Sequence, residues 1–123
     1  MRNSVEKATY WINFLAEVPE VPFADRLKAH FHAGKITRFC DCGCNSFDLR
    51  IDTEVVLPPL TDANGRSGKF FEIAFESNGG PEIAFLFFVD DRGYLSGIDV
   101  TSGAANHGAI PDSVTVGKLL YVI

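Results

Sequence analysis

The sequence predicts an α+β fold in which two N-terminal helices pack on one face of an antiparallel β-sheet. Apolar residues recur at helical spacing up to Gly34 and alternate with polar residues after it. Helices that come first, followed by consecutive strands, are typical of helices grouped on one side of an antiparallel sheet. A chain of 123 residues can bury one core but not two, so residues 1–123 are predicted to form a single domain.

The first helix is expected to run from Asn3, a candidate N-cap with Glu6 three residues later, to a point before Pro19. Its apolar residues form one stripe at helical spacing. A second helix is expected to begin near Pro22 and to stop at Gly34. Proline is tolerated in the first turn of a helix, and glycine favours a helix end.

The remaining chain alternates as strands do. From Phe47 to Val55 apolar residues or threonine occupy the odd positions and charged residues occupy all the even ones. Phe71–Phe75 repeats this pattern, and Ile83–Val89 is apolar on both faces. Three of these strands follow one another along the chain with turns between them: Phe71–Phe75, Ile83–Val89 and Tyr94–Val100. They predict a three-stranded antiparallel meander. The C-terminal run Val114–Ile123 allows either a last strand or a short helix.

Three cysteines, Cys40, Cys42 and Cys44, lie within five residues and are the only cysteines of the chain. An odd number so close together excludes a disulfide framework, and the first residues lack the apolar centre of a secretory signal. We therefore expect a cytoplasmic protein. Three thiolates and a histidine would suffice for zinc, but common zinc sites use Cys-x-x-Cys spacing. A small zinc-binding or redox protein is thus the alternative, and the favoured expectation is a protein without metal or cofactor.

The histidines do not predict an active site. His30 and His32 lie near the end of the second helix and are expected to be cap or surface residues. His107 lies in a loop with no nucleophile or orienting carboxylate identifiable beside it. Asp90 and Asp91 adjoin a glycine and are expected to form a turn. No catalytic residue is assigned, so the sequence predicts a protein that is not an enzyme.

The formal net charge of −5 comes from one stretch of the chain. Residues 70–100 contain six acidic residues and a single basic one, Arg92, whereas acids and bases balance elsewhere. Nucleic acids and anionic membranes attract proteins with an excess of Lys and Arg, so neither is an expected partner. A basic protein suits this charge better.

The sequence predicts that these charges gather on the sheet face opposite the helices. That face is expected to carry six carboxylates: Asp48, Asp52, Glu54, Glu72, Glu76 and Asp99. Arg50 is the only base in the predicted strands that carry these acids, and Leu86, Phe88 and Phe70 are expected among them. Aromatic groups amid acids suit a basic protein partner. The predicted partner-binding residues are Glu72, Glu76, Asp99, Phe88, Asp52 and Glu54. A solvated face partly covered by the C-terminal segment remains the alternative.

Two segments carry a family resemblance: Phe39-Cys-Asp-Cys-Gly-Cys-Asn-Ser-Phe-Asp-Leu and, later, Phe87-Phe-Val-Asp-Asp-Arg-Gly-Tyr-Leu-Ser-Gly-Ile-Asp-Val. Together they resemble small bacterial proteins of unknown function that contain a Cys-Gly-Cys segment. Small acidic α+β proteins of this type also resemble the immunity proteins of contact-dependent inhibition and other polymorphic toxin systems. The resemblance implies a non-catalytic cytoplasmic protein that neutralises a cognate toxin domain, often a basic nuclease. It assigns no binding residue.

Overall fold

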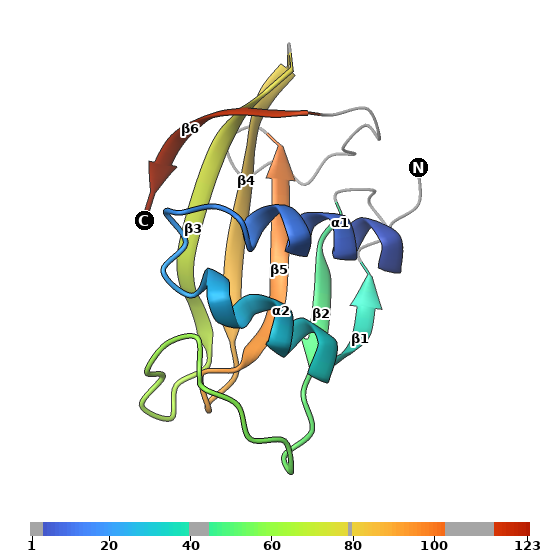
Figure 1. Ribbon diagram of the computed structural model, residues 1–123, viewed down its shortest axis with the longest axis vertical. Helices are drawn as coiled ribbons and strands as arrows, with labels where there is room; N and C mark the ends of the chain where they lie inside the picture. The colour runs from blue at the N-terminus through green and yellow to red at the C-terminus, as the bar shows by residue number, and fades with distance from the viewer. Residues whose placement is uncertain (1–3, 40–44, 79, 103–114) are drawn as a thin grey trace.

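A computed structural model describes residues 4–39, 45–78, 80–102 and 115–123. Within these ranges the chain forms two helices and one six-stranded antiparallel sheet (Figure 1), which confirms the α+β class. The elements are, in chain order, α1 (Val5–Leu15), α2 (Ala24–Ala33), β1 (Lys35–Phe39), β2 (Phe47–Arg50), β3 (Gly68–Ser77), β4 (Gly80–Val89), β5 (Leu95–Ser102) and β6 (Val116–Val122). Neither helix is long and apolar enough to span a membrane.

The strands lie in the order β1-β2-β5-β4-β3-β6, and all neighbours are antiparallel. The consecutive strands β3, β4 and β5 are adjacent, so the predicted meander is confirmed. The C-terminal run, for which the sequence allows a strand or a helix, is the edge strand β6 beside β3. The first strand, β1, lies outside the segments predicted from alternation and forms a hairpin with β2.

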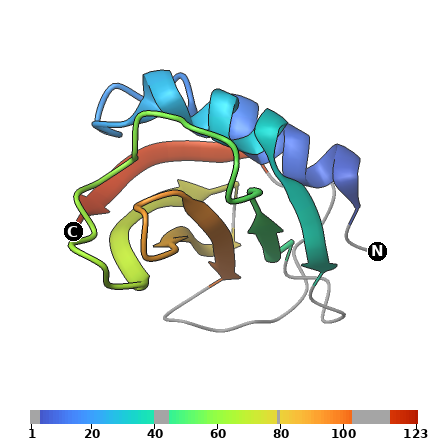
Figure 2. The same ribbon diagram turned by 90° about the horizontal axis from the view of Figure 1, so that it is seen from below.

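Aromatic residues fix the position of the helices on the sheet. Figure 2 shows α1 and α2 on the same side of the curved sheet. The Trp11 ring of α1 lies 5.0 Å from Phe85, and Phe23 at the start of α2 lies 5.1 Å from Phe87. Phe85 and Phe87 share one face of β4 because they are two residues apart. We call the sheet face that carries them the inner face and the opposite one the outer face.

The helix boundaries differ slightly from those predicted. Asn3 lies outside the described residues, and the N-cap of α1 is Ser4, whose hydroxyl accepts a hydrogen bond from the third amide after it. The second helix begins at Ala24, two residues later than Pro22, and the Ala24 amide makes a turn bond to the Val21 carbonyl at 3.2 Å. It ends at Gly34 as predicted, where the glycine amide bonds to the last turn.

Between β2 and β3 lies a long loop, residues 51–67, which contains no helix or strand. Its backbone is held by the turn between β4 and β5. The Tyr94 hydroxyl accepts a hydrogen bond from the Leu57 amide at 2.8 Å, and the Gly93 carbonyl accepts one from the Leu60 amide at 2.9 Å. A loop of this length without structure of its own usually has a function or is disordered. Here it is ordered by contacts with the rest of the fold.

Gly93 is the position where the loop approaches the turn most closely. It has a left-handed conformation, φ 80°, and a Cβ there would overlap the carbonyl oxygen of Thr61 in the long loop. Gly65, with φ 76°, is also left-handed but has open space around it. A left-handed alanine costs about 1–2 kcal/mol, so this penalty is common to both positions. We expect Gly93→Ala to reduce the free energy of unfolding in urea clearly more than Gly65→Ala. Equal losses would mean that the loop is not seated on Gly93.

Candidate functional site

The outer face of the central strands brings acidic and apolar side chains together. Leu86 of β4 lies opposite Glu72 of β3 on one side and opposite Asp99 of β5 on the other. Phe88, two residues along β4, shares this face, and both Leu86 and Phe88 are partly exposed. Directly opposed side chains are about 5 Å apart at Cβ. Glu76, exposed and four residues beyond Glu72, completes a set that we call the outer patch: Glu72, Glu76, Leu86, Phe88 and Asp99.

Glu72 is the most firmly held member of the outer patch. The Tyr121 hydroxyl of β6 donates a hydrogen bond of 2.6 Å to one carboxylate oxygen, and the Lys69 ammonium donates one of 2.9 Å to the other. The Glu72 side chain is only 15% exposed. The bond from Tyr121, followed by that from Lys69, holds the pKa of Glu72 below its ordinary value. The same bond raises the pKa of Tyr121 to about 12. Glu72 is therefore an ionised group that joins the edge strand to the sheet.

Phe70 does not lie on the outer face, so that prediction is wrong. Its ring packs 5.0 Å from Phe23, on the inner side. The register shifts between Lys69 and Phe71, where β3 has one residue more than β4. Such a bulge breaks the simple alternation of side chains and turns Phe70 toward the helices.

The outer face also contains more positive charge than expected. Asp48 pairs with Arg38 of β1 at 3.0 Å, and Lys69 pairs with Glu72. Arg38 and Lys69 lie outside the segments that were predicted as strands, so the face carries more bases than those segments contain. The Arg38 and Asp48 side chains are both exposed, and exposed pairs of this kind contribute little stability. They do reduce the acidic character of the β1–β2 end of the sheet, which leaves the excess of acid over β3 to β5.

Asp52 and Glu54 are not part of the outer patch, because β2 ends at Arg50 rather than at Val55. The guanidinium of Arg92 binds the backbone directly after β2: it donates to the carbonyl of Ile51 at 2.6 Å and to that of Asp52 at 3.0 Å. These carbonyls are therefore bonded to a side chain and not to a neighbouring strand. Both carboxylates are exposed on the long loop.

His30 is a completely buried residue, so its predicted role as a cap or surface residue is wrong. Its Nδ1 accepts a hydrogen bond from the Leu95 amide at 3.2 Å, and its Nε2 lies 2.7 Å from the carbonyl of Pro58. Both ring nitrogens are thus engaged with backbone groups. The exposed His32 agrees with the prediction.

The alternative metal site lies outside the part of the chain that can be tested. Cys40, Cys42 and Cys44, together with His107, fall outside the described residues. Among the described ranges, no group of three or more His, Cys, Asp or Glu residues is placed to hold a metal ion.

The turn between β4 and β5 forms as predicted around Asp90. Its carboxylate accepts hydrogen bonds from the amides of Arg92 and Tyr94 at 2.8 and 3.1 Å. The other carboxylate oxygen pairs with the Arg92 guanidinium at 2.9 Å, and that guanidinium lies 4.3 Å from the centre of the Tyr94 ring. Asp90 therefore positions Arg92, which in turn binds the first residues of the long loop.

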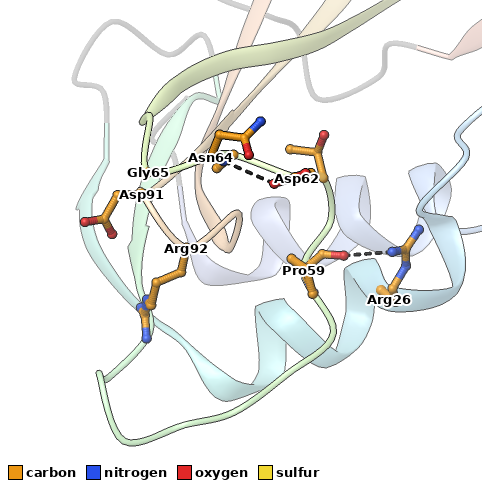
Figure 3. Close-up of a pocket in the computed structure, with 9 residues that line it drawn as sticks. Arg26, Pro59, Asp62, Asn64, Gly65, Asp91 and Arg92 are labelled. Carbon is orange, nitrogen blue, oxygen red and sulfur yellow. Dashed lines mark hydrogen bonds between the residues drawn. The ribbon is translucent and has the colours of Figure 1, made fainter.

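A pocket of about 420 Å³ opens between α2, the long loop and this turn (Figure 3). Arg26 and Arg92 are the cations that line it. The Arg26 guanidinium donates to the Pro59 carbonyl at 2.7 Å, and Arg92 is engaged as described above. Asp62, also in the lining, accepts a hydrogen bond from the Asn64 amide at 3.2 Å. The polar groups of this pocket thus hold the loop in place.

Sequence reasoning missed the residues that fasten the loop, although one of them was detectable. His30 follows Phe23 by seven residues and Leu27 by three, so it lies on the buried stripe of its helix. Nothing in the sequence pattern indicates that Tyr121 binds Glu72, because the two residues are 49 positions apart.

Removing the Tyr121 hydroxyl should destabilise the fold above the titration range of Glu72. Tyr121→Phe removes a hydrogen bond to a charged group, worth roughly 1.5 kcal/mol for a partly buried hydroxyl. Because folding lowers the pKa of Glu72, this stabilisation is complete above the unfolded value of 4.5 and disappears as pH falls through the folded value. The free energies of unfolding of both proteins, measured in urea from pH 7 to pH 3, should therefore converge at low pH.

Tyr10→Phe is the matched control, since Tyr10 is 54% exposed. It should behave as wild type throughout. A loss in Tyr121→Phe that persists undiminished at pH 3 would contradict the assigned bond.

Comparisons with protein families, with curated proteins and with solved structures find no match for this chain.

Proposed function

We propose that this protein is not an enzyme but an immunity protein, which binds a basic toxin domain through the outer patch and blocks its substrate-binding surface. The observation that supports this most directly is the cross-strand row in which the partly exposed Leu86 stands between Glu72 and Asp99. The family resemblance of the sequence points to the same class of protein.

Charge favours a basic partner. The stretch 70–100 holds six acidic residues against one basic residue, and two of its acids, Glu72 and Asp99, flank the apolar centre of the patch. Complementary charge speeds the encounter of two proteins and fixes their relative orientation. Such a partner would present Lys or Arg to the patch.

The apolar members of the patch would supply affinity. Leu86 and Phe88 lie next to each other on the outer face of β4 and are partly exposed. A partner that covers them removes apolar surface from water, which favours association by about 25 cal/mol per Å² before the costs of binding are counted. Aromatic residues are enriched at the centres of protein interfaces.

The patch is also preorganised. Its central members lie on β4 and β5, which are bonded to neighbouring strands on both sides, and Glu72 is held by two hydrogen bonds. Side chains that are already fixed lose little conformational entropy on binding. Glu72, paired with Lys69, is therefore a fixed carboxylate at the edge of the interface, and Glu76 carries the more accessible charge.

The inhibitory mechanism follows from this chemistry. A nuclease grips its substrate through Lys and Arg side chains that contact phosphates. Carboxylates on a rigid sheet would engage those side chains in place of the phosphates, and the apolar centre would slow dissociation. Inhibition is thus by occlusion and requires no bond to be made or broken.

The test takes the C-terminal domain of the protein encoded beside the gene for this chain. It asks whether that domain is toxic to cells, whether this chain rescues them, and what the dissociation constant of the purified pair is. Glu76→Lys reverses an exposed charge within the patch, and Phe88→Ala removes an apolar contact. We expect each to weaken binding at least about tenfold, or ~1.4 kcal/mol, and Glu76→Lys to reduce the dependence of affinity on salt.

Glu54→Lys makes the same charge reversal at an exposed position of the long loop and serves as the control. It should bind like wild type. If Glu54→Lys weakens the complex and the two patch variants do not, the outer patch is the wrong surface. If the neighbouring domain neither binds nor is neutralised, the immunity proposal fails.

A further inference from the structure

His30 is a buried titratable group that none of the preceding roles uses. Its Nδ1 faces the Leu95 amide, which can only donate, so Nδ1 must accept. Its Nε2 faces the carbonyl oxygen of Pro58, which can only accept, so Nε2 must carry the proton. The structure is therefore compatible with one form of the ring alone, the neutral tautomer protonated at Nε2.

The surroundings of the ring come from three elements. On its own helix, Arg26 is one turn away; from the turn between β4 and β5, Asp90 and Arg92 approach; and the Tyr94 ring packs edge-on at 5.2 Å. Burial is the main cause that lowers the pKa of His30, with the two arginines acting in the same direction. The hydrogen bond to Pro58 and the charge of Asp90 act against it but do not cancel it.

The bond from His30 reaches the long loop at Pro58, in the middle of a short run of backbone bonds. Residues 51–67 form no helix or strand, and the loop backbone next to Pro58 is also held by the Leu57 bond to Tyr94, the Arg26 bond to Pro59 and the Leu60 bond to Gly93. His30 thus connects three parts of the chain that are remote in sequence: α2, the loop at Pro58 and the first residue of β5.

We propose that His30 is a pH-dependent fastener of the long loop, which holds residues 57–60 in place while its ring is neutral and releases them when a proton binds Nδ1 at mildly acidic pH. A proton on Nδ1 turns the acceptor that the Leu95 amide uses into a second donor, so that bond is lost. A positive charge is then enclosed beside two arginines. The bond from Nε2 to Pro58 favours the charged ring, but the cost of burial is larger. The charged ring therefore gains by leaving its buried position for water, and when it leaves, its bond to Pro58 is broken.

The direction of the pH dependence is fixed by linkage. In the closed loop the pKa of His30 is lowered, whereas in the open loop the ring is hydrated and has an ordinary value of about 6.5. Closure is therefore fully favoured above about pH 6.5 and weakens as pH falls below it. With an open-state value of 6.5, the population of the open loop rises between pH 7.5 and pH 5.5 by a factor of which about tenfold is the upper limit.

Amide hydrogen exchange followed by NMR tests this, with rates corrected for the intrinsic effect of pH. The reporters of the loop are the amides of Leu57 and Leu60, and the amide of Phe85 in the central strand reports global unfolding. We expect loop protection to fall by up to about tenfold from pH 7.5 to pH 5.5 while that of Phe85 is retained.

Two variants on the same helix isolate the ring. His30→Gln provides one donor and one acceptor but does not titrate, so its loop protection should not change with pH. His32→Gln removes the exposed histidine and should behave as wild type. A pH-dependent loss that persists in His30→Gln, or that disappears in His32→Gln, would overturn the proposal. So would a loss of protection at Phe85 equal to that of the loop.

If His30→Gln fails to fold, the proposal is tested by NMR on the His30 ring of the wild-type protein. Its nitrogen chemical shifts should show the tautomer protonated at Nε2 at pH 7.5. Below pH 6.5 the change in those shifts should follow the loss of loop protection. A ring that is protonated at Nδ1 at neutral pH, or that becomes charged with no change in loop exchange, would refute the fastener.

Discussion

The packing of Phe85 and Phe87 on the inner face of β4 is the contact on which the rest of the structure depends. Phe85 contacts Trp11 and Phe87 contacts Phe23, so one strand holds both helices. Each aromatic pair contributes about 0.5–1.5 kcal/mol beyond the burial of its area, and truncation of such a residue to alanine costs about 3–5 kcal/mol. Once these two rings face inward, Leu86 and Phe88 must face outward. The inner core and the outer patch both follow from the way successive side chains of β4 point to opposite faces of the sheet.

Most of the architecture follows from patterns that are local in sequence. The α+β class, the order of helices and strands, and the β3–β4–β5 meander are confirmed because each depends on periodicity within about ten residues. The predictions are wrong where the end of a strand or the direction of a side chain depends on more than the alternating pattern. Arg92 draws the chain away from β2 after Arg50, and a bulge turns Phe70 inward. Neither effect is visible in an alternating pattern.

The candidate site was predicted in part. Alternation placed Glu72, Asp99 and Phe88 on the face opposite the helices, and the strand register brings them close together. It did not show that Glu72 is bound by Tyr121 and Lys69, since one of these partners comes from the far end of the chain. A carboxylate is simple to recognise in a sequence, whereas its availability depends on tertiary contacts. For the same reason, the engagement of both nitrogens of His30 became apparent only in the fold.

The long loop is held through its backbone, by Arg26 at Pro59, His30 at Pro58 and Arg92 at Ile51 and Asp52. Every residue has a carbonyl oxygen, so these bonds do not depend on which side chains the loop carries. Exposed loop residues can therefore be exchanged by mutation while the path of the chain is retained. The constraint falls instead on the donors outside the loop and on the buried loop residues Ile51 and Leu60, which belong to the core. Such an arrangement separates the shape of a surface segment from its chemistry, and it allows the segment to acquire new specificities without a new fold.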